Sequence, residues 1–172
     1  SRLNTGKLKL NLGPVIVQNI VEEVISVLTS EATSKDVAIE IDLPRNGDEL
    51  LVAEADPVRM EQIIWNLLNN ALKFSPAGNE IRLVLSHDED SARLQVIDHG
   101  VGLSHDSLEH IFDLFSQAAP QHASHSREGL GIGLSLVRQL VEAHGGKVRA
   151  ASPGLGLGCT FTVTLPLCDS QC

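Results

Sequence analysis

One stretch of this chain combines a complete helix signal with an unusual polar stripe: Asp56-Pro-Val-Arg-Met-Glu-Gln-Ile-Ile-Trp-Asn-Leu-Leu-Asn-Asn-Ala-Leu-Lys-Phe74. Asp56 is a typical N-cap residue, and Pro57 suits the first helical position because it has no N–H to leave unpaired. The sequence Ser75-Pro-Ala-Gly78 is typical of a helix end. These signals predict a helix over 57–74.

Polar and apolar residues lie on opposite sides of this predicted helix at about 100° per residue. The polar stripe consists of Gln62, Asn66, Asn70 and Lys73, with Asn69 beside it, and the apolar face carries Ile64, Leu67, Leu68, Ala71 and Leu72. A solvated face is one interpretation, but such faces normally use Glu and Lys, whereas Asn disfavours helix. An amide oxygen suits Mg²⁺ held together with phosphate oxygens, and Lys73 could meet a phosphate.

On both sides of this helix, helical and alternating patterns of apolar residues predict further helices and strands. Further helices are predicted from Pro14 to about Leu28, over 104–115 and over 131–144, and strands over 37–43, 50–53, 80–86, 92–98, 148–151 and 159–165. We expect the 50–53 strand to pair with the 37–43 strand, and residues 1–13 to form an edge strand. The sum predicts an α/β (α+β) two-layer sandwich, a mixed sheet with helices on one face.

Composition limits the possible functions. The 172 residues are 42% hydrophobic and 20% charged, as in one globular domain, and the net charge of −9 disfavours binding to nucleic acid or to anionic membranes. No apolar run is long enough to span a bilayer, so we expect no membrane insertion. The three cysteines form no CxxC motif, which predicts reduced thiols and a cytoplasmic location.

Asp98 and the glycines after it form a second candidate site. Asp98 shares strand parity with Leu94 and Val96 and is therefore expected to point to the apolar side, where a carboxylate needs a donor. It could simply bond to the next turn, or it could accept a ligand amino group such as that of adenine. Gly100 and Gly102 would let a flat base approach the backbone.

A glycine-rich segment, Gly129-Leu-Gly131-Ile-Gly133-Leu, opens the 131–144 helix. Glycines before a helix suit phosphate binding, but no strand precedes them as in a dinucleotide-binding motif, and no Gly-Lys-Ser/Thr follows as in a P-loop. Residues 116–128 lack apolar periodicity and predict a mobile loop. Arg127 within that loop is either solvated or able to reach a terminal phosphate.

Taken together and in this order, the segments closely resemble the catalytic, ATP-binding domain of sensor histidine kinases, in the superfamily shared with gyrase, Hsp90 and MutL. The similarity covers nearly the whole chain. The matching motifs are the N box (61–75), the G1 box (98–103), the F box (111–115), the G2 box (129–134) and the terminal strand (158–166).

The resemblance implies a Bergerat-type fold and a role for each motif residue. Asn70 would bind Mg²⁺, Asn66 would support the metal and phosphates, and Lys73 and Arg127 would contact phosphate. Asp98 would fix the adenine amine. The remaining residues implied to bind the nucleotide or anchor an ATP lid over 116–130 are Gly100, Gly102, Phe112, Phe115, Gly129, Gly131, Gly133 and Thr160.

The implied enzyme is a protein histidine kinase of a two-component system, transferring the γ-phosphoryl of Mg·ATP to a histidine on a separate domain. Residues 1–13 would follow a missing dimerisation hairpin carrying that histidine, 14–167 would be the ATP-binding domain, and 168–172 a tail. Expected partners are the acceptor-His domain and a response regulator or receiver domain. The parent protein could be anchored in a membrane.

Position 66 separates this chain from hydrolytic members of the superfamily, which keep a Glu there to activate water. Asn66 cannot act as a general base, which favours phosphoryl transfer over rapid ATP hydrolysis. Two alternatives stay open: a degenerate kinase domain acting as a non-catalytic regulatory module, and an ATPase of the gyrase and Hsp90 type.

Overall fold

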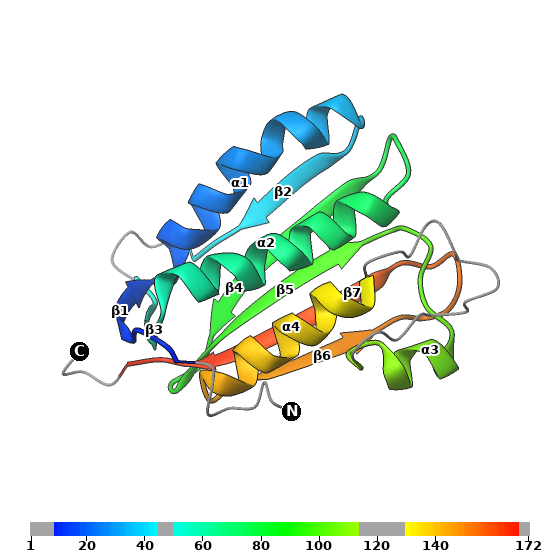
Figure 1. Cartoon of the computed structure of the whole chain (residues 1–172). Coiled ribbons are helices and arrows are strands. Elements are labelled where there is room, and N and C mark those ends of the chain that lie inside the picture. The colour runs from blue at the N-terminus through cyan, green and yellow to red at the C-terminus, as the bar shows by residue number, and fades with distance from the viewer. Residues whose placement is uncertain (1–8, 45–49, 114–129, 169–172) are drawn as a thin grey trace.

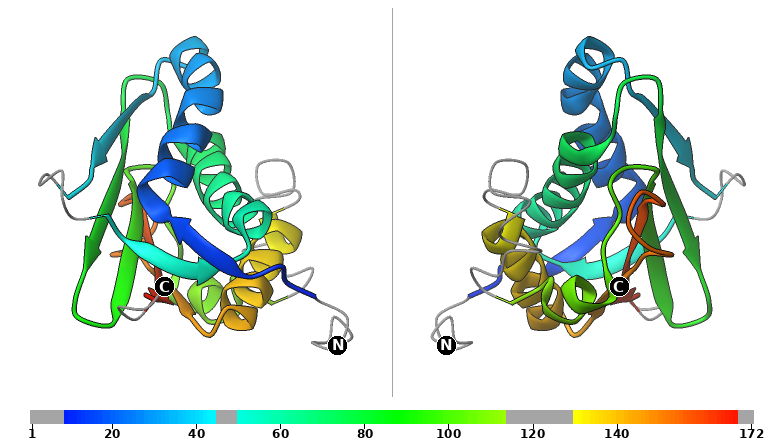
Figure 2. Two further views of the ribbon diagram at one scale, coloured as in Figure 1. Left: turned by 90° about the vertical axis from the view of Figure 1, so that its left-hand side faces the viewer. Right: turned by 90° about the vertical axis from the view of Figure 1, so that its right-hand side faces the viewer.

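A computed structural model describes residues 9–44, 50–113 and 130–168. The three long helices lie side by side on one face of a five-stranded sheet, and the other face is open (Figures 1 and 2). The helices are α1 (Val17–Ser34), α2 (Pro57–Phe74), the short α3 (His105–His110) and α4 (Leu130–Ala143). The strands are β1 (Gly13–Ile16), β2 (Ala38–Asp42), β3 (Val52–Ala55), β4 (Glu80–His87), β5 (Ser91–Asp98), β6 (Lys147–Ala151) and β7 (Cys159–Pro166).

The main sheet has the strand order β2-β4-β5-β7-β6. Strands β2 and β4 are parallel, and all other neighbours are antiparallel. Helix α2 lies on the connection between the parallel strands, as a crossover between parallel strands requires. The predicted two-layer sandwich with a mixed sheet is confirmed.

The N-terminal region differs from the prediction. Pro14 lies in β1 rather than at a helix start, and α1 begins at Val17. Among the described strands, β1 pairs only with β3, and a residue without an N–H is tolerated on the edge that no described strand covers. The edge strand predicted over 1–13 is therefore wrong for 9–12, where no strand forms, and residues 1–8 lie outside the described part.

Two further boundaries were predicted wrongly. The 50–53 strand is β3, shifted to Val52–Ala55, and it pairs with β1 rather than with β2. Of the helix predicted over 104–115, the described residues form only α3, capped by Ser104, whose side-chain oxygen accepts a hydrogen bond from the Ser107 N–H. The chain leaves this helix at Ile111, which is buried in the core.

The core lies between the helices and the inner face of the sheet. Period-two alternation buries Leu83 and Leu85 of β4, and Leu94 and Val96 of β5, against the apolar face of α2. Burial of this apolar area is the main stabilising term of the layer. Within the described segments, no helix combines the length and the apolar character needed to cross a membrane.

One of the two described cysteines differs from the prediction. Cys159 is buried and is not in a disulfide, whereas Cys168 is disulfide-bonded. The prediction that all the thiols are reduced is therefore wrong for Cys168.

Candidate functional site

A small cavity lies between the C-terminal half of α2, the ends of β5 and β7, and the loop after β5. Its lining includes Asn70 and Phe74 of α2, Asp98 of β5 and Gly102 of the loop, with Val101, Leu103, Ile111, Cys159 and Phe161 completing the wall. The fold thus brings the amide stripe and the predicted buried carboxylate to one place. They are 28 positions apart in sequence, and meet because α2 packs on the end of β5.

Asp98 is 5% exposed, as its strand parity predicted. Its Oδ1 accepts a hydrogen bond from the Gly100 N–H at 2.9 Å, which fixes the carboxylate at the cavity wall. A Cβ on Gly100 would lie 2.1 Å from the Phe74 carbonyl oxygen, so only glycine fits between Asp98 and the end of α2.

Gly102 closes the loop on its other side. It has a φ of +68°, and a Cβ there would lie 2.2 Å from the Gly154 carbonyl oxygen. The loop is also bonded to the segment before β7, because the Gly158 N–H donates to the Gly100 carbonyl and the Gly156 N–H to that of Val101. The backbone beside Asp98 is therefore held from both sides.

Asn70 supplies an unusual group to the cavity. Its side-chain oxygen Oδ1 is buried and has no hydrogen-bond partner among the described residues. A buried polar atom without a partner costs free energy, and such atoms are rare in native structures unless a water, an ion or a ligand completes them. This oxygen is the strongest indication that the cavity receives a ligand.

Asn66 lies one turn earlier on α2 and faces α4. Its Nδ2 donates to the Gln62 carbonyl at 2.8 Å, and its Oδ1 lies 3.4 Å from the position of a Cβ on Gly133. The amide stripe and the third glycine of the 129–133 segment thus come together, which agrees with the resemblance, since it implies that both lie near the phosphates. Gly131 lies in the first turn of the same helix.

The remaining predicted residues have mixed placements. Phe112 is half-buried and makes an edge-to-face contact with the cavity residue Phe161, with ring centroids 6.1 Å apart. Lys73 is exposed in the last turn of α2. Phe115, Arg127 and Gly129, and the predicted lid apart from Leu130, lie outside the described residues.

Thr160 does not line the cavity. In β7 the residues of opposite parity, Cys159 and Phe161, face the cavity, so Thr160 lies on the open face of the sheet. Cys159 is the register partner of Asp98. Both lining residues were missed in the sequence analysis, although strand parity could have identified them once the pairing with Asp98 was known.

The two helices that carry the motif residues are tied together at their far ends. The Asp56 N–H donates to Nε2 of His144 at 3.1 Å, and His144 Nδ1 lies 2.7 Å from the Leu140 carbonyl. Nδ1 therefore carries the proton and Nε2 accepts. His144 is buried just after α4, and this network was not predicted from the sequence.

The Asp56 carboxylate caps α2. Burial acts to raise its pKa, but the N–H groups of Asn11, Arg59 and Val58, together with the Arg59 charge, outweigh burial and hold the pKa below its usual value. The ionised carboxylate is also stabilised by the positive end of the α2 dipole. This cap positions α2, and with it Asn66 and Asn70.

No group of three or more His, Cys, Asp or Glu side chains that could hold a metal occurs in the described segments. A metal bound here would therefore depend on few protein ligands and on oxygens of another ligand. Mg²⁺ binds in this way, and the unpartnered Asn70 oxygen is a suitable hard ligand for it.

The sequence pattern described as "Histidine kinase-, DNA gyrase B-, and HSP90-like ATPase" matches residues 55–169. This chain belongs to that family. The match begins just before the α2 cap and ends after β7, so it includes every element that lines the cavity. The chain is an ATP-binding domain of the histidine kinase type.

Relatives and solved structures agree with this assignment. The chain is 34% identical to sensor protein KdpD of Clostridium acetobutylicum over 96% of its own length and 18% of the relative's. It is 34% identical to the circadian input-output histidine kinase CikA of Synechocystis sp., over 96% of this chain and 22% of the relative. The chain thus spans about a fifth of the length of these relatives.

Among solved structures, full-length ShkA in complex with AMPPNP has a TM-score of 0.79 and 30% identity, covering 96% of this chain and 33% of ShkA. The mycobacterial sensor histidine kinase MprB has a TM-score of 0.78 at 24% identity, covering 90% of this chain and 98% of that one. The MprB likeness supports the fold alone.

Proposed function

We propose that this chain is the catalytic domain of a two-component sensor kinase, and that it transfers the γ-phosphoryl group of Mg·ATP to a histidine on a separate domain. The observation that carries the proposal is the buried, unpartnered Asn70 oxygen in the cavity that also contains Asp98. One wall offers a carboxylate for an amino group, and the other an amide oxygen for a metal. A purine nucleotide bound to Mg²⁺ has both groups.

Each predicted site residue that lies in the described part of the chain and near the cavity has a role in this proposal. Asp98 accepts from the adenine amine, and the backbone at Gly100 and Gly102 borders the ring. Asn70 holds Mg²⁺ through Oδ1, supported by Asn66, while Lys73 reaches a phosphate from its exposed position. The metal, when bound, neutralises charge on the phosphate oxygens.

Transfer rather than hydrolysis is favoured by the chemistry of position 66. The Asn66 amide cannot take a proton from water, and its Nδ2 is engaged with the Gln62 carbonyl. A histidine nitrogen supplied by another domain would form the new bond to the γ-phosphorus as the bond to ADP breaks. Catalysis by this chain then consists of positioning and charge stabilisation.

The cavity has a volume of about 10 Å³, the room of about one water molecule. A purine therefore requires part of the wall to move outward. The loop residue Val101, at 46%, is the most exposed residue of that wall. We expect ATP to shift the backbone amide resonances of 99–103 more than those of β5.

The proposal includes the partners and the location. An acceptor-His domain and a response regulator or receiver domain would receive the phosphoryl group in turn. Arg127, Phe115, Gly129 and Gly131 would contribute to the phosphate side and the lid. The reaction would take place in the cytoplasm, whether or not the parent protein is anchored in a membrane.

The test is phosphotransfer in trans. The chain is mixed with γ-labelled ATP, MgCl₂ and a purified acceptor-His domain, and acid-labile, base-stable label on the acceptor is measured over time. We expect transfer to exceed release of free phosphate. ATP binding without any transfer, or rapid steady-state hydrolysis by the chain alone, would contradict the proposal.

Asn70→Ala sharpens this test. It removes the amide oxygen, so we expect at least about 100-fold slower transfer and loss of the Mg²⁺ dependence of ATP binding. Asn69→Ala, which changes the neighbouring amide beside the stripe, is the matched control and should retain both. Mg²⁺ dependence that persists in Asn70→Ala would place the metal elsewhere.

A further inference from the structure

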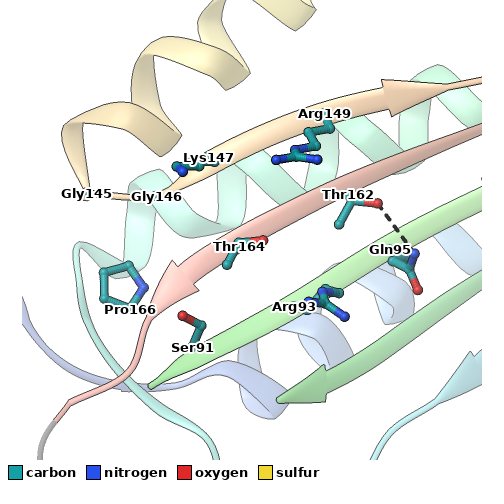
Figure 3. Close-up of a pocket in the computed structure, with 10 residues that line it drawn as sticks. All are labelled: Ser91, Arg93, Gln95, Gly145, Gly146, Lys147, Arg149, Thr162, Thr164 and Pro166. Atoms are coloured by element: carbon teal, nitrogen blue, oxygen red, sulfur yellow. Dashed lines mark hydrogen bonds between the residues drawn. The ribbon is translucent and has the colours of Figure 1, made fainter. Parts of the chain in front are cut away.

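A second cavity of the described chain is much larger than the nucleotide cavity. It is a groove of about 610 Å³ on the open face of the sheet, formed by β5, β7 and β6 (Figure 3). Figure 3 shows the helices behind the strands and the groove side chains in front. The side chains that matter here are Arg93, Gln95, Lys147, Arg149, Thr162 and Thr164.

Strand register arranges these side chains in two rows. Arg93, Thr164 and Lys147 form one row across the three strands, and Gln95, Thr162 and Arg149 form the next. Neighbouring strands are about 4.8 Å apart, and alternate residues along a strand are about 6.6 Å apart. Three cations therefore frame a floor of threonine hydroxyls about 10 Å wide and 7 Å long.

The charge of the groove opposes that of the chain. The chain has a net charge of −9, yet no described residue that lines the groove is acidic. Arg82 on the same sheet face pairs with Asp42, and Arg138 pairs with Glu142. No ion pair between described residues includes Arg93, Lys147 or Arg149.

One acid that interacts with Arg93 is Asp88, at the hairpin tip between β4 and β5. The pKa of Asp88 lies below its usual value, first because the N–H groups of Asp90 and Ser91 donate to it, and to a smaller extent because of the Arg93 charge. Arg93 is thus partly compensated by this tip. Lys147 and Arg149, on the edge strand β6, gain most from an external anion.

The donors available in the groove favour spread carboxylates over one compact phosphate. Phosphate sites usually use backbone N–H groups at helix starts. Here the N–H groups of Gly145 and Gly146 already donate to the Glu142 and Val141 carbonyls, so these backbone groups are not available to a phosphate.

An extended chain matches the spacing of the cations. Alternate side chains of an extended peptide are about 6.6 Å apart, and Lys147 and Arg149 have the same separation along β6. Arginine binds carboxylates in a bidentate, planar geometry.

We propose that this groove binds an extended acidic segment of a partner protein, with carboxylates at alternate positions. The site lies on the opposite face of the sheet from the nucleotide cavity, and the proposal does not depend on phosphotransfer. A partner bound there would leave the cavity and the helices accessible.

The test titrates a short peptide of alternating serine and glutamate into the ¹⁵N-labelled chain at low salt. We expect saturable shifts of the Arg93, Lys147, Arg149, Thr162 and Thr164 amides, and weaker binding as salt is raised. The double substitution Lys147→Gln and Arg149→Gln should weaken binding at least about tenfold, since it removes two charge-assisted contacts.

Arg82→Gln is the matched control. It makes the same kind of charge change on the same sheet face, outside the groove, and should change peptide affinity less than about twofold. Thermal unfolding of each variant verifies that it is folded. The single variant Arg149→Gln provides the same comparison if the double variant fails to fold.

Three results would overturn the proposal. The first is the absence of saturable shifts at millimolar peptide. The second is binding that Arg82→Gln weakens as much as the groove variants do. The third is preferential binding of inorganic phosphate or a single-stranded oligonucleotide by the groove, because either would assign the site to a phosphate ligand.

Discussion

The two faces of the five-stranded sheet are formed by the same strands and differ completely in chemistry. On the inner face of β5, Leu94, Val96 and Asp98 are buried under the helices, and Asp98 meets Asn70 in the cavity. On the outer face, Arg93 and Gln95 line the open basic groove. Adjacent residues of one strand thus serve a buried ligand site and a solvated surface, because strand side chains alternate.

The largest effect is expected for an inner-face core residue. Leu83→Ala in β4 removes a fully buried side chain and should lower the free energy of unfolding by roughly 2–5 kcal/mol. Val84→Ala, the next residue and on the outer face, should cost less than about 1 kcal/mol. Denaturant unfolding measures both, and similar losses would mean that the outer face is covered in solution.

A second substitution breaks the comparison at the site itself. Asp98→Asn replaces a carboxylate with an amide that presents a donor to the adenine amine, and ATP affinity should fall about 100-fold, or roughly 3 kcal/mol. Gln95→Ala, on the same strand but on the outer face, should leave ATP affinity unchanged. Calorimetric titration compares the two, and unchanged affinity in a folded Asp98→Asn protein would remove Asp98 from the site.

The third prediction concerns how the helix layer is held. Asp56 has a lowered pKa in the folded chain, so its carboxylate stabilises the fold above its unfolded pKa of about 4, and this contribution is lost as pH falls through the lower folded value. Asp56→Ala should therefore cost about 1 kcal/mol at pH 7 and less at pH 3.

Asp56→Asn is the control for the charge. Its side-chain oxygen can still cap α2, but the amide does not titrate. The difference in the free energy of unfolding between wild type and Asp56→Asn should therefore still depend on pH, although the cap is kept. Chemical denaturation at several pH values measures these differences. A cost of Asp56→Ala that grows as pH falls would contradict the sign of the pKa shift.

The smallest effect on stability is expected for an exposed ion pair between β2 and β4, on the outer face of the sheet. Arg82 and Asp42 form an exposed ion pair with an N–O distance of 3.2 Å. Exposed pairs contribute little, so Arg82→Gln should change stability by less than about 1 kcal/mol, and less still at high salt. A larger loss in thermal unfolding would show that the outer face contributes to the fold through its charges.

Local signals were sufficient for the main elements. Asp56, Pro57 and the Ser75-Pro76 sequence predicted α2 with the bounds that the structure has. Alternation predicted β4 and β5 to within one residue, and parity predicted that Asp98 is buried. Caps and periodicity act over a few residues, so they are visible without the fold.

Pairing between distant segments was harder to predict. Pro14 is compatible with a helix start and with an edge strand, and only the partnership with β3 makes it a strand residue. The parity of β7 relative to the cavity depends on its register with β5. The resemblance implied Thr160, and without that register Cys159 and Phe161 were not identified.

The sequence by itself determined the amphipathic helix, the order of the motifs and the family that their order indicates. Tertiary structure alone decided that Asn70 keeps an unpartnered oxygen beside Asp98, that His144 joins α4 to the start of α2, and that three cations meet on one sheet face. Local patterns depend on neighbours within a turn or two, whereas a site depends on which distant surfaces pack together. That packing is set by the burial of the whole core.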